Sequence, residues 1–432
     1  MKIGVQTWGS DGDINPFIAL AGGLSAAGHD VTLAIMSAER KDYERFAARL
    51  GFRLIPFGYI WTEEELIRII RKMNATTNMF KQLDLVLDDM FEPGVDAMYE
   101  MALSLCADNE IVIGHFILHP LHAAAEKARK PYVTVTLNHG AIPTRHAAPA
   151  GLRSFGTWLN GMVWKVAVKI LEGHILPSIN RLRRREGLLP ASSFRDIWES
   201  PLCNLIAVSP QFCEPKQDWS PNQHVCGFFR MPEAATSWEI PDGLARFLSD
   251  GPPPVYMTFG SMLRVEPDAE RLTETTRLLV EAAKHADCRA IIQSRWDEVR
   301  GIPESPDIYR VEEAPHTKIF PHCAAVVHHG GAGTTQTATL CGCPSVVVAH
   351  ITDQYFWGRE LKRLGVAPNL LERRKMTSRK LGREIRQVLD SQKMGNRAKE
   401  LAAALAAENG ALNAVALIER MMPELYETSR TG

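Results

Sequence analysis

The chain has 432 residues, 45% of them hydrophobic, and its formal net charge at pH 7 is −1. This length predicts two or three domains with sizeable buried cores. The near-zero charge argues against a dedicated nucleic-acid binder, because such proteins need a basic excess to meet phosphate backbones. We therefore expect a small molecule as the partner.

The N-terminus and the cysteines bear on location. The first residues, MKIGVQTW, enter a strand pattern without the apolar core and cleavage site of a signal peptide. No window holds about 18 consecutive apolar residues, as a membrane-spanning helix would. The eight cysteines are scattered and form no CxxC pair, which is typical of a reducing compartment. The sequence predicts a cytoplasmic protein.

Apolar strand-like runs alternate with amphipathic segments in the first half of the chain. The expected strands are residues 2–8, 29–35, 52–58, 110–116 and 131–137, and helices are expected at 16–27 and 38–50. This alternation predicts βαβ units and a parallel sheet. Gly28 is placed as a helix C-cap and Pro16 near a helix start.

Two longer segments, residues 62–105 and 151–187, carry Met, Phe, Trp and Leu at helical spacing. Such apolar periodicity marks either core packing or the lining of an apolar acceptor pocket. Prolines and polar residues replace the periodicity at residues 231–243, which predicts an interdomain linker.

A second α/β series follows the linker. Strands are expected at 254–260, 289–294, 308–313, 324–329 and 344–350, and helices at 269–284 and 333–342. The prediction is an α/β fold of two doubly wound, Rossmann-like domains, residues 1–230 and 244–432, with the last helix able to pack back on the first domain. Ligands of such sheets bind at the carboxyl ends of the strands, so we expect a ligand cleft between the domains.

The stretch HHGGAGTT, residues 328–335, joins a buried strand to a helix. Glycines at a helix start present free backbone N–H groups at the positive end of the helix dipole, which favours an anion such as phosphate. The stretch has neither the lysine of a Walker loop nor the GxGxxG fingerprint. A diphosphate would then be met by the dipole, by Thr334 and Thr335, and by the His329 imidazole. The alternative is a tight turn that needs glycine for steric reasons alone.

Four segments in order resemble nucleotide-sugar-dependent glycosyltransferases of the GT-B fold, in the UDP-glycosyltransferase superfamily, specifically the sterol, macrolide and glycopeptide-modifying enzymes. They are residues 8–24, 255–262, 314–335 and 353–361, and they cover both expected domains. The resemblance implies a donor-binding set of Gly260, Ser261, His316, His329, Gly331, Ala332, Gly333, Thr334, Thr335, Asp353 and Gln354. The segment Ala314 to His316 would touch base and ribose, and Asp353 and Gln354 would bond sugar hydroxyls, which both donate and accept.

One position departs from the family pattern. Plant members carry a tryptophan where Glu313 stands, so stacking of the base on that residue is not available here. The choice between uracil and thymine, and hence between UDP- and TDP-sugars, stays open.

By the same resemblance Asp13 is the general base that takes a proton from the acceptor hydroxyl. The acceptor site would be lined by Ser10, Gly12, His115 and His139. The alternative is that Asp13 N-caps the first helix, and the two uses can coexist. Asp11 and Asp13 also match the DxD of metal-dependent glycosyltransferases, but that motif belongs to another fold. We expect neither a metal nor a cofactor.

Two further clusters are ambiguous. His115, His119 and His122 have ligand-like spacing but straddle a strand end and a helix start, which favours core or pocket histidines over a zinc site. The run Arg181 to Arg185 is either a solvated helix face or a contact for anionic lipid, so peripheral membrane contact is one expectation.

Together the motifs predict an inverting, metal-independent hexosyltransferase. It would move a hexose, glucose first, from UDP-glucose or another UDP- or TDP-sugar to a sterol, lipid, polyketide or phenolic hydroxyl. Backside attack on an α-linked donor, through an oxocarbenium-like transition state, would leave a β-glycoside. Two alternatives stay open: a nucleotide-sugar epimerase-like enzyme, which needs no apolar pocket, and a non-catalytic nucleotide-sugar-binding protein.

Overall fold

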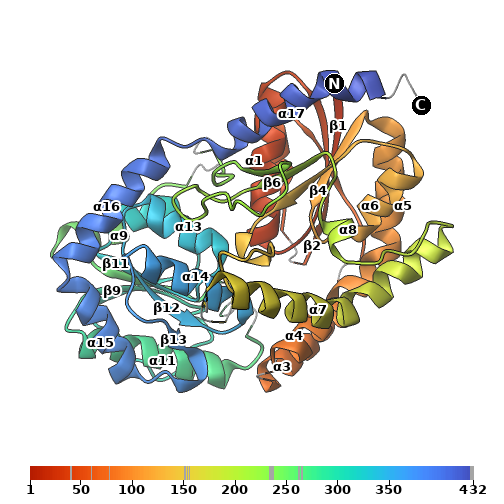
Figure 1. The fold of residues 1–432 in the computed structure, drawn as a ribbon. Helices are drawn as coiled ribbons and strands as arrows, with labels where there is room; N and C mark the ends of the chain where they lie inside the picture. Colours follow the sequence, from red (N-terminus) through yellow and green to blue (C-terminus); the bar gives the residue numbers. More distant parts are fainter. Residues whose placement is uncertain are drawn as a thin grey trace. The chain divides into compact units, whose positions relative to one another are not determined.

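The computed structural model describes residues 1–38, 41–59, 61–76, 78–149, 152, 154, 156–232, 238–260, 263 and 266–428. The chain forms two compact units. The first comprises Met1–Thr62, Thr76–Thr236 and Glu408–Gly432, and the second comprises Glu63–Ala75 and Ser237–Ala407. Each unit is built on one parallel sheet, so the predicted α/β class is confirmed (Figure 1).

The first unit holds seven strands. They are β1 (Lys2–Gly9), β2 (Asp30–Ser37), β3 (Arg53–Pro56), β4 (Ile111–His115), β5 (Tyr132–Thr136), β6 (Cys203–Ile206) and β7 (Gln223–Val225). Their order in the sheet is β3-β2-β1-β4-β5-β6-β7, and all pairs are parallel. Buried aliphatic side chains of β1 and β4, such as Val5 and Ile113, pack against helix α1 (Asp11–Ala26) in one continuous core.

Helix α1 ends as its sequence predicts. Gly28 has φ of +88°, and the N–H groups of Gly28 and His29 donate to the carbonyls of Ser25 and Leu24. This is the Schellman arrangement, in which a left-handed glycine satisfies the last carbonyls of a helix. The start of α1 differs from the prediction, because the helix begins at Asp11 and Pro16 therefore lies inside it.

The other helical segments of the first unit surround its sheet. They are α2 (Glu44–Leu50), α4 (Met79–Asp84), η1 (Leu85–Phe91), η2 (Glu92–Gly94), α5 (Val95–Asp108), α6 (His119–Lys127), η3 (His139–Ala141), α7 (Thr157–Arg185), α8 (Arg195–Trp198) and α17 (Gly410–Thr428). The segment 62–105 is largely helical, as expected, but it is divided into several pieces, and the first of them, α3 (Glu63–Ala75), belongs to the second unit. Strands β6 and β7 were not predicted.

The second unit holds six strands. They are β8 (Val255–Met257), β9 (Ala290–Gln293), β10 (Ile308–Val311), β11 (Ala325–His328), β12 (Ser345–Ala349) and β13 (Leu371–Glu372), in the order β10-β9-β8-β11-β12-β13. Its helical segments are α9 (Asp242–Ser249), α11 (Ala269–His285), α12 (His316–Ile319), η5 (Phe320–His322), α13 (Ala332–Leu340), α14 (Thr352–Arg363), η6 (Arg373–Lys375), α15 (Ser378–Leu389) and α16 (Gln392–Ala406). Aliphatic residues such as Val327 and Val346 form the core between this sheet and α11 and α15.

The strand order reverses at one place in each sheet. In the first unit, β2 and β3 lie on one side of β1, and β4 to β7 lie on its other side. The second unit does the same between β8 and β11. Loops at such a reversal diverge to opposite faces and leave room for a ligand at the carboxyl ends of the two strands. The loops after β1, β4, β8 and β11 are therefore where a site is expected.

The C-terminal segment Gln392–Met421 has the length and mean hydropathy of a membrane-spanning helix, which corrects the expectation that no segment would. It is not one helix, because residues 407–409 separate α16 from α17. Helix α16 packs against α13 in the second unit, and α17 packs against α1 in the first. Gly227 and Gly410 meet so closely that a Cβ at Gly410 would overlap the Gly227 backbone. We infer that the two helices belong to the two folded units.

Candidate active site

Asp13 lies in the first turn of α1, directly after β1. Its Oδ2 accepts hydrogen bonds from the Ser10 backbone N–H at 3.0 Å and from the Ser10 hydroxyl at 3.1 Å. Ser10 is the N-cap and Asp13 is the third helical residue, so the alternative in which Asp13 is itself the N-cap is wrong. The carboxylate nevertheless stabilises the helix start and is fixed in orientation.

His115 ends β4, the strand beside β1 at the reversal. Its Nε2 lies 4.0 Å from Oδ1 of Asp13, and its Nδ1 accepts from the Ile117 N–H at 3.5 Å. Because Nδ1 is the acceptor, the proton of the neutral ring is on Nε2, which faces the carboxylate. Burial lowers the pKa of His115 to about 3, so the ring is neutral at pH 7. The carboxylate of Asp13 is 40% exposed and can be reached by an acceptor.

Asp11 does not pair with Asp13 as a DxD motif would require. It is held by the Lys41 ammonium and by the Tyr43 hydroxyl, whose oxygen lies 2.9 Å from Oδ1. The Lys41 ammonium thus binds the Asp11 carboxylate oxygen that a metal ion would need as a ligand. Among the residues described by the structure, no three His, Cys, Asp or Glu side chains form a metal-binding group.

The remaining predicted acceptor residues, Gly12 and His139, lie near the starts of two helical segments. Gly12 is in the first turn of α1, and Pro16 removes the N–H that would otherwise bond its carbonyl. His139 begins η3, directly after β5, and is partly exposed. Both positions follow carboxyl ends of strands in the first sheet.

The three spaced histidines do not converge. His119 is buried with its ring centroid 5.4 Å from that of Phe91, and His122 lies edge-on to the Tyr132 ring. Burial lowers the pKa of His119 to about 3 and that of His122 to about 4. These two are core residues, and only His115 reaches the Asp13 carboxylate.

In the second unit, the reversal brings Gly260 after β8 next to His329 after β11. Gly260 has φ of +55°, and a Cβ there would lie 2.8 Å from Cε1 of His329. A Cβ at Gly331 would overlap Nε2 of the same ring. Glycine at both positions is therefore required by the approach of the imidazole, which supports the steric interpretation at these two residues.

His329 is almost fully buried, and its Nδ1 has no hydrogen-bond partner. Burial, with the neighbouring His316, lowers the pKa of His329 to about 4. The predicted countercharge is thus absent at neutral pH, where this imidazole offers one N–H donor and one acceptor instead. An unpartnered buried ring nitrogen costs free energy unless a ligand satisfies it.

Helix α13 begins directly at this ring. Its N-cap is Gly331, which provides no side-chain cap, so the first N–H groups of the helix are not satisfied by a side chain. Thr334 and Thr335 lie in its first turns, and the buried Oγ1 of Thr335 has no partner. A Cβ at Gly333 would meet no atom within 4 Å. Steric need does not explain Gly333, and the open space beside it is what an anion at the helix start would occupy.

The next strand, β12, contributes His350, Asp353 and Gln354. Oε1 of Gln354 accepts from the backbone N–H groups of His350 at 2.7 Å and Ile351 at 3.2 Å, so this buried amide fixes the loop. Its Nε2 is the group left to meet a sugar hydroxyl. Asp353 is the second residue of α14 (Thr352–Arg363) and is exposed.

The ring of His316 is held between aromatic side chains. It stacks on Phe320 with centroids 4.6 Å apart and meets Tyr256 edge-on at 5.7 Å. Glu313 is exposed. Ser261 lies outside the described residues.

Sequence reasoning missed His350. Its Nδ1 lies 3.0 Å from the Val348 carbonyl, so Nδ1 donates and Nε2 is the acceptor. Its ring packs edge-on against Phe259, and burial lowers its pKa to about 3. The sequence feature that could have identified His350 is its position directly after β12, the strand that follows the HHGG segment.

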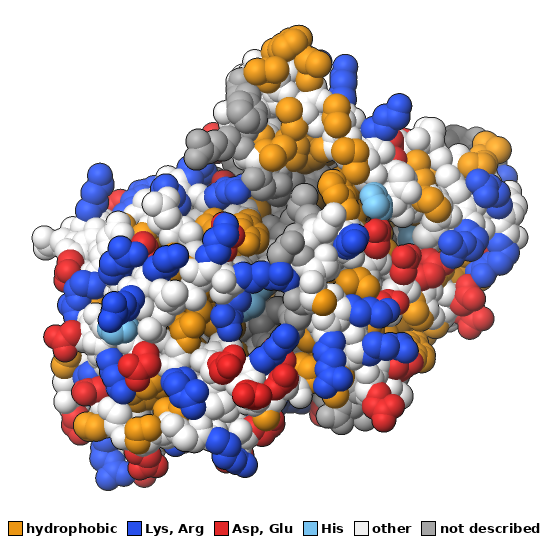
Figure 2. Space-filling view, turned by 90° about the horizontal axis from the view of Figure 1, so that it is seen from below, with side chains coloured by type: hydrophobic (Ala, Val, Ile, Leu, Met, Phe, Trp, Pro, Cys, Tyr) orange, Lys and Arg blue, Asp and Glu red, His pale blue; other side chains and the backbone are white. Residues whose placement is uncertain are grey.

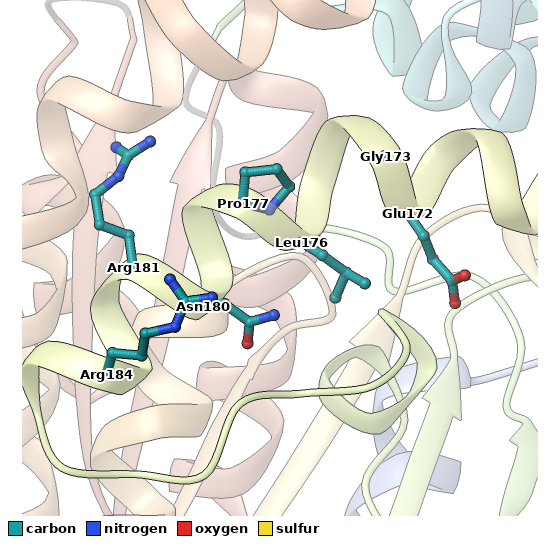
Figure 3. A pocket seen from close by; sticks show the side chains of 7 residues that line it. All are labelled: Glu172, Gly173, Leu176, Pro177, Asn180, Arg181 and Arg184. Carbon is teal, nitrogen blue, oxygen red and sulfur yellow. The ribbon is translucent and has the colours of Figure 1, made fainter.

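A surface hollow of about 520 Å³ lies elsewhere, along α7 (Figure 3). It is lined by Glu172, Gly173, Leu176, Pro177, Asn180, Arg181 and Arg184, all from this one helix. None of the predicted site residues belongs to it. We do not assign it to substrate.

Comparisons with known proteins agree with this geometry. A family profile described as "Erythromycin biosynthesis protein CIII-like, C-terminal domain" matches residues 277–421. O-mycaminosyltylonolide 6-deoxyallosyltransferase of Streptomyces fradiae is 31% identical over 445 residues, covering 100% of this chain and 99% of the relative. Sterol 3-beta-glucosyltransferase of Aspergillus oryzae is 28% identical, covering 97% of this chain, which spans only 30% of that relative.

Solved structures show the same fold. The glycotransferase of kitacinnamycin superposes with a TM-score of 0.69 at 18% identity, covering 97% of this chain and 98% of the other. Glycosyltransferase VinC in complex with DTDP superposes with a TM-score of 0.67 at 17% identity, covering 98% and 100%. At this identity the likeness establishes the two-domain architecture.

Proposed function

Because this chain belongs to the nucleotide-sugar-dependent glycosyltransferases of the GT-B fold, we propose that it transfers a hexose from a TDP- or UDP-linked donor to a hydroxyl of an apolar acceptor. The observation that carries the donor assignment is the uncapped start of α13 beside the buried, unpartnered Nδ1 of His329. A diphosphate would supply the acceptors that these donors lack.

The donor nucleotide and sugar form the finer part of the proposal. The Streptomyces relative is named for a deoxyallosyl transfer, the sterol relatives for glucosyl transfer, and VinC was solved with DTDP. TDP-hexoses and UDP-glucose are therefore both candidates, with glucose tested first. Macrolide-like polyketides and sterols are the acceptor classes that these relatives support.

The proposed chemistry is inverting and uses Asp13 as general base. The carboxylate takes the proton of the acceptor hydroxyl while the oxygen attacks the anomeric carbon and the nucleoside diphosphate departs. The Nε2–H of His115 orients the carboxylate, and the α13 start with His329 stabilises the departing diphosphate. No metal takes part in this scheme, which is supported by the engagement of Asp11 with Lys41.

The test is an assay of donors against acceptors. TDP-glucose and UDP-glucose are incubated with polyketide, sterol and phenolic acceptors, and products are read by mass spectrometry. We expect the acceptor to gain one hexosyl residue, with the β-configuration by NMR, and Asp13→Asn to give no product. Free epimerised donor in the absence of acceptor, or donor binding with no product from any acceptor, would contradict the proposal. Loss of turnover in EDTA would overturn metal independence.

The cytoplasmic location is likewise a proposal. It is supported by the eight cysteines, all of which are free thiols, five of them buried. Fractionation of the producing cells, with the chain followed by antibody, tests it.

A further inference from the structure

The N-terminal half of α7 exposes a row of large apolar side chains. Trp158, Met162, Val166 and Ile170 recur at every fourth position, which places them on one side of the helix, and all four are exposed, Trp158 by 73%. Trp164 faces the other way, is buried and donates its Nε1–H to the Ala147 carbonyl at 2.8 Å. Contiguous exposed apolar rows are unusual on a soluble surface and mark an interaction site.

The chain segment that carries this row has only basic charges until Glu172. The sequence contains no Asp or Glu between Glu126 and Glu172, a span that includes seven Lys and Arg residues. Lys165 and Lys169 lie on the exposed part of α7 beside the apolar row. Figure 2 shows hydrophobic side chains gathered on a protruding part of the surface, with Lys and Arg side chains nearby.

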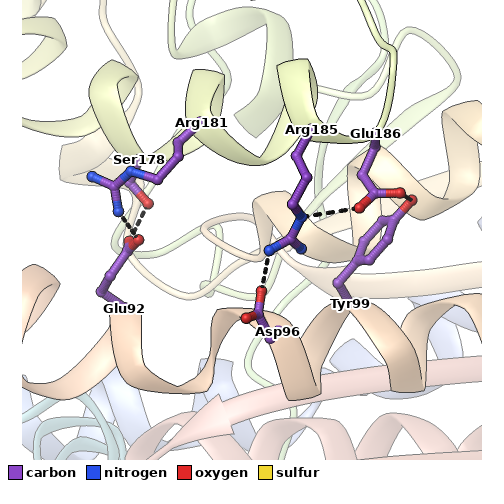
Figure 4. A network of polar contacts seen from close by, with 7 residues as sticks. All are labelled: Glu92, Asp96, Tyr99, Ser178, Arg181, Arg185 and Glu186. Atoms are coloured by element: carbon purple, nitrogen blue, oxygen red, sulfur yellow. Dashed lines mark hydrogen bonds and ion pairs between the residues drawn. The ribbon is translucent and has the colours of Figure 1, made fainter.

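The C-terminal half of α7, in contrast, is held by polar contacts to neighbouring segments of the first unit (Figure 4). Arg181 and Ser178 both bond Glu92, and Arg185 donates to Asp96 at 2.6 Å. Figure 4 also shows Glu186 bonded to Arg185 and to the Tyr99 hydroxyl.

A further contact belongs to this anchor. Arg183, which is buried, makes a bidentate pair with Glu126 at 2.7 and 3.0 Å. Three arginines of the run 181–185 are thus engaged with acids, which favours a structural role for them. The anchored half holds the apolar half of the helix in place.

We propose that the N-terminal half of α7 binds the surface of an anionic lipid bilayer. The row from Trp158 to Ile170 would enter the boundary between headgroups and acyl chains, and Lys165 and Lys169 would meet lipid phosphates. An exposed tryptophan at one end suits this boundary, where its ring is apolar and its N–H can stay hydrated. A second copy of the chain fits less well, because pairing of two such faces would bring Lys165 and Lys169 of both copies together.

This surface does not depend on the transfer chemistry, and the site residues lie on other elements. An enzyme bound to the membrane surface would meet apolar acceptors in the bilayer, into which such molecules partition.

The test is co-sedimentation of the full chain with vesicles. We expect binding to vesicles of phosphatidylcholine with phosphatidylglycerol, weaker binding to phosphatidylcholine alone, and a loss of binding as salt is raised. Trp158→Ser with Val166→Ser should weaken binding at least tenfold. Lys165→Ser with Lys169→Ser should remove the preference for the anionic vesicles.

Matched controls lie on other exposed apolar positions. Leu189→Ser and Leu412→Ser replace side chains that are 81% and 51% exposed, and both should bind as the unchanged chain does. Circular dichroism melting checks that each variant is folded, and turnover of a water-soluble acceptor should be unchanged in the α7 variants.

Two results would overturn the inference. One is vesicle binding that the α7 variants leave unaltered. The other is no vesicle binding together with a dimer, seen by light scattering, that Trp158→Ser with Val166→Ser dissolves, since this would assign the surface to a second copy. Absence of transfer activity alone would count against the proposed function and leave this result standing.

Discussion

Nε2 of His115 lies 4.0 Å from Oδ1 of Asp13. The two side chains come from neighbouring strands at the reversal of the first sheet, one after β1 and the other at the end of β4. Oδ2 of the same carboxylate is bonded to Ser10. The carboxylate is thus oriented on one oxygen by the helix start and faces a neutral imidazole with the other.

Asp13→Asn should abolish transfer while leaving donor binding intact. The amide keeps the size of the side chain but cannot accept the acceptor's proton, and general base catalysis contributes about 10²–10⁴-fold in rate. The measurement is kcat by product mass spectrometry, with Kd for TDP and UDP from calorimetry. Turnover within threefold of the unchanged enzyme would remove Asp13 from the mechanism.

His115→Phe should lower kcat roughly tenfold with little change in the KM for donor. The phenyl ring can keep the packing against Phe17 and Phe116, while the polar contact of Nε2 with the Asp13 carboxylate at 4.0 Å is lost. Because burial lowers the pKa of His115 to about 3, its protonation should not shape the pH–rate profile between pH 5 and 9. An inflection near pH 6.5 that disappears in His115→Phe would contradict this positioning role.

The fold could be predicted where a strand forms a long apolar run in the sequence. The strands β1, β2, β4 and β12 were located to within two residues, because each is an apolar run bounded by turn residues. Strands β6 and β7, of four and three residues, were not predicted. The segment 62–105 was expected to be helical, but its division into several pieces depends on packing that periodicity does not encode.

The candidate site residues could be named from the sequence, but what each of them can do could not. The resemblance supplied Asp13 and His329, but hydrogen-bond partners decide what each can do. Ser10 rather than Asp13 is the N-cap of α1, and the carbonyl oxygen of Gln354 accepts hydrogen bonds from the backbone of the loop before α14. Both facts rest on distances of about 3 Å, which no sequence pattern determines. The neutral state of His329 follows from its burial, which is a property of the folded sheet.

Binding of TDP should take up a proton through His329. Burial holds the pKa of the free ring at about 4, and a diphosphate beside it would raise that pKa by favouring the imidazolium. Affinity should therefore increase as pH falls from 7 towards 5. Calorimetry at pH 5.5 in two buffers of different ionisation enthalpy measures the proton uptake, which should be absent in His329→Gln. Affinity that is independent of pH in this range would contradict a contact between the diphosphate and this ring.

Stability should decline on acidification. Burial lowers the pKa of His115, His119, His328 and His350 to about 3 and that of His329 to about 4. The unfolded chain, with histidine pKa values near 6.5, binds more protons below that pH than the folded chain does. The contribution of these rings is thus present above pH 6.5 and is lost progressively as pH falls towards 4. Melting temperatures measured at pH 7.5, 6, 5 and 4 should fall, and His115→Phe should show a shallower decline.

Gly333→Ala separates the two interpretations of the HHGGAGTT segment. The added methyl meets no atom within 4 Å, and alanine is favoured over glycine inside a helix by about 1 kcal/mol. Folding stability should therefore stay the same or rise. The methyl would, however, enter the space at the uncapped start of α13, where the diphosphate is expected, so the Kd for TDP or UDP should rise at least tenfold. Gly331→Ala is the contrasting variant, since its methyl overlaps Nε2 of His329 and should lower both stability and binding. If Gly333→Ala binds the nucleotide as the unchanged chain does, the glycines serve the turn alone and the anion site lies elsewhere.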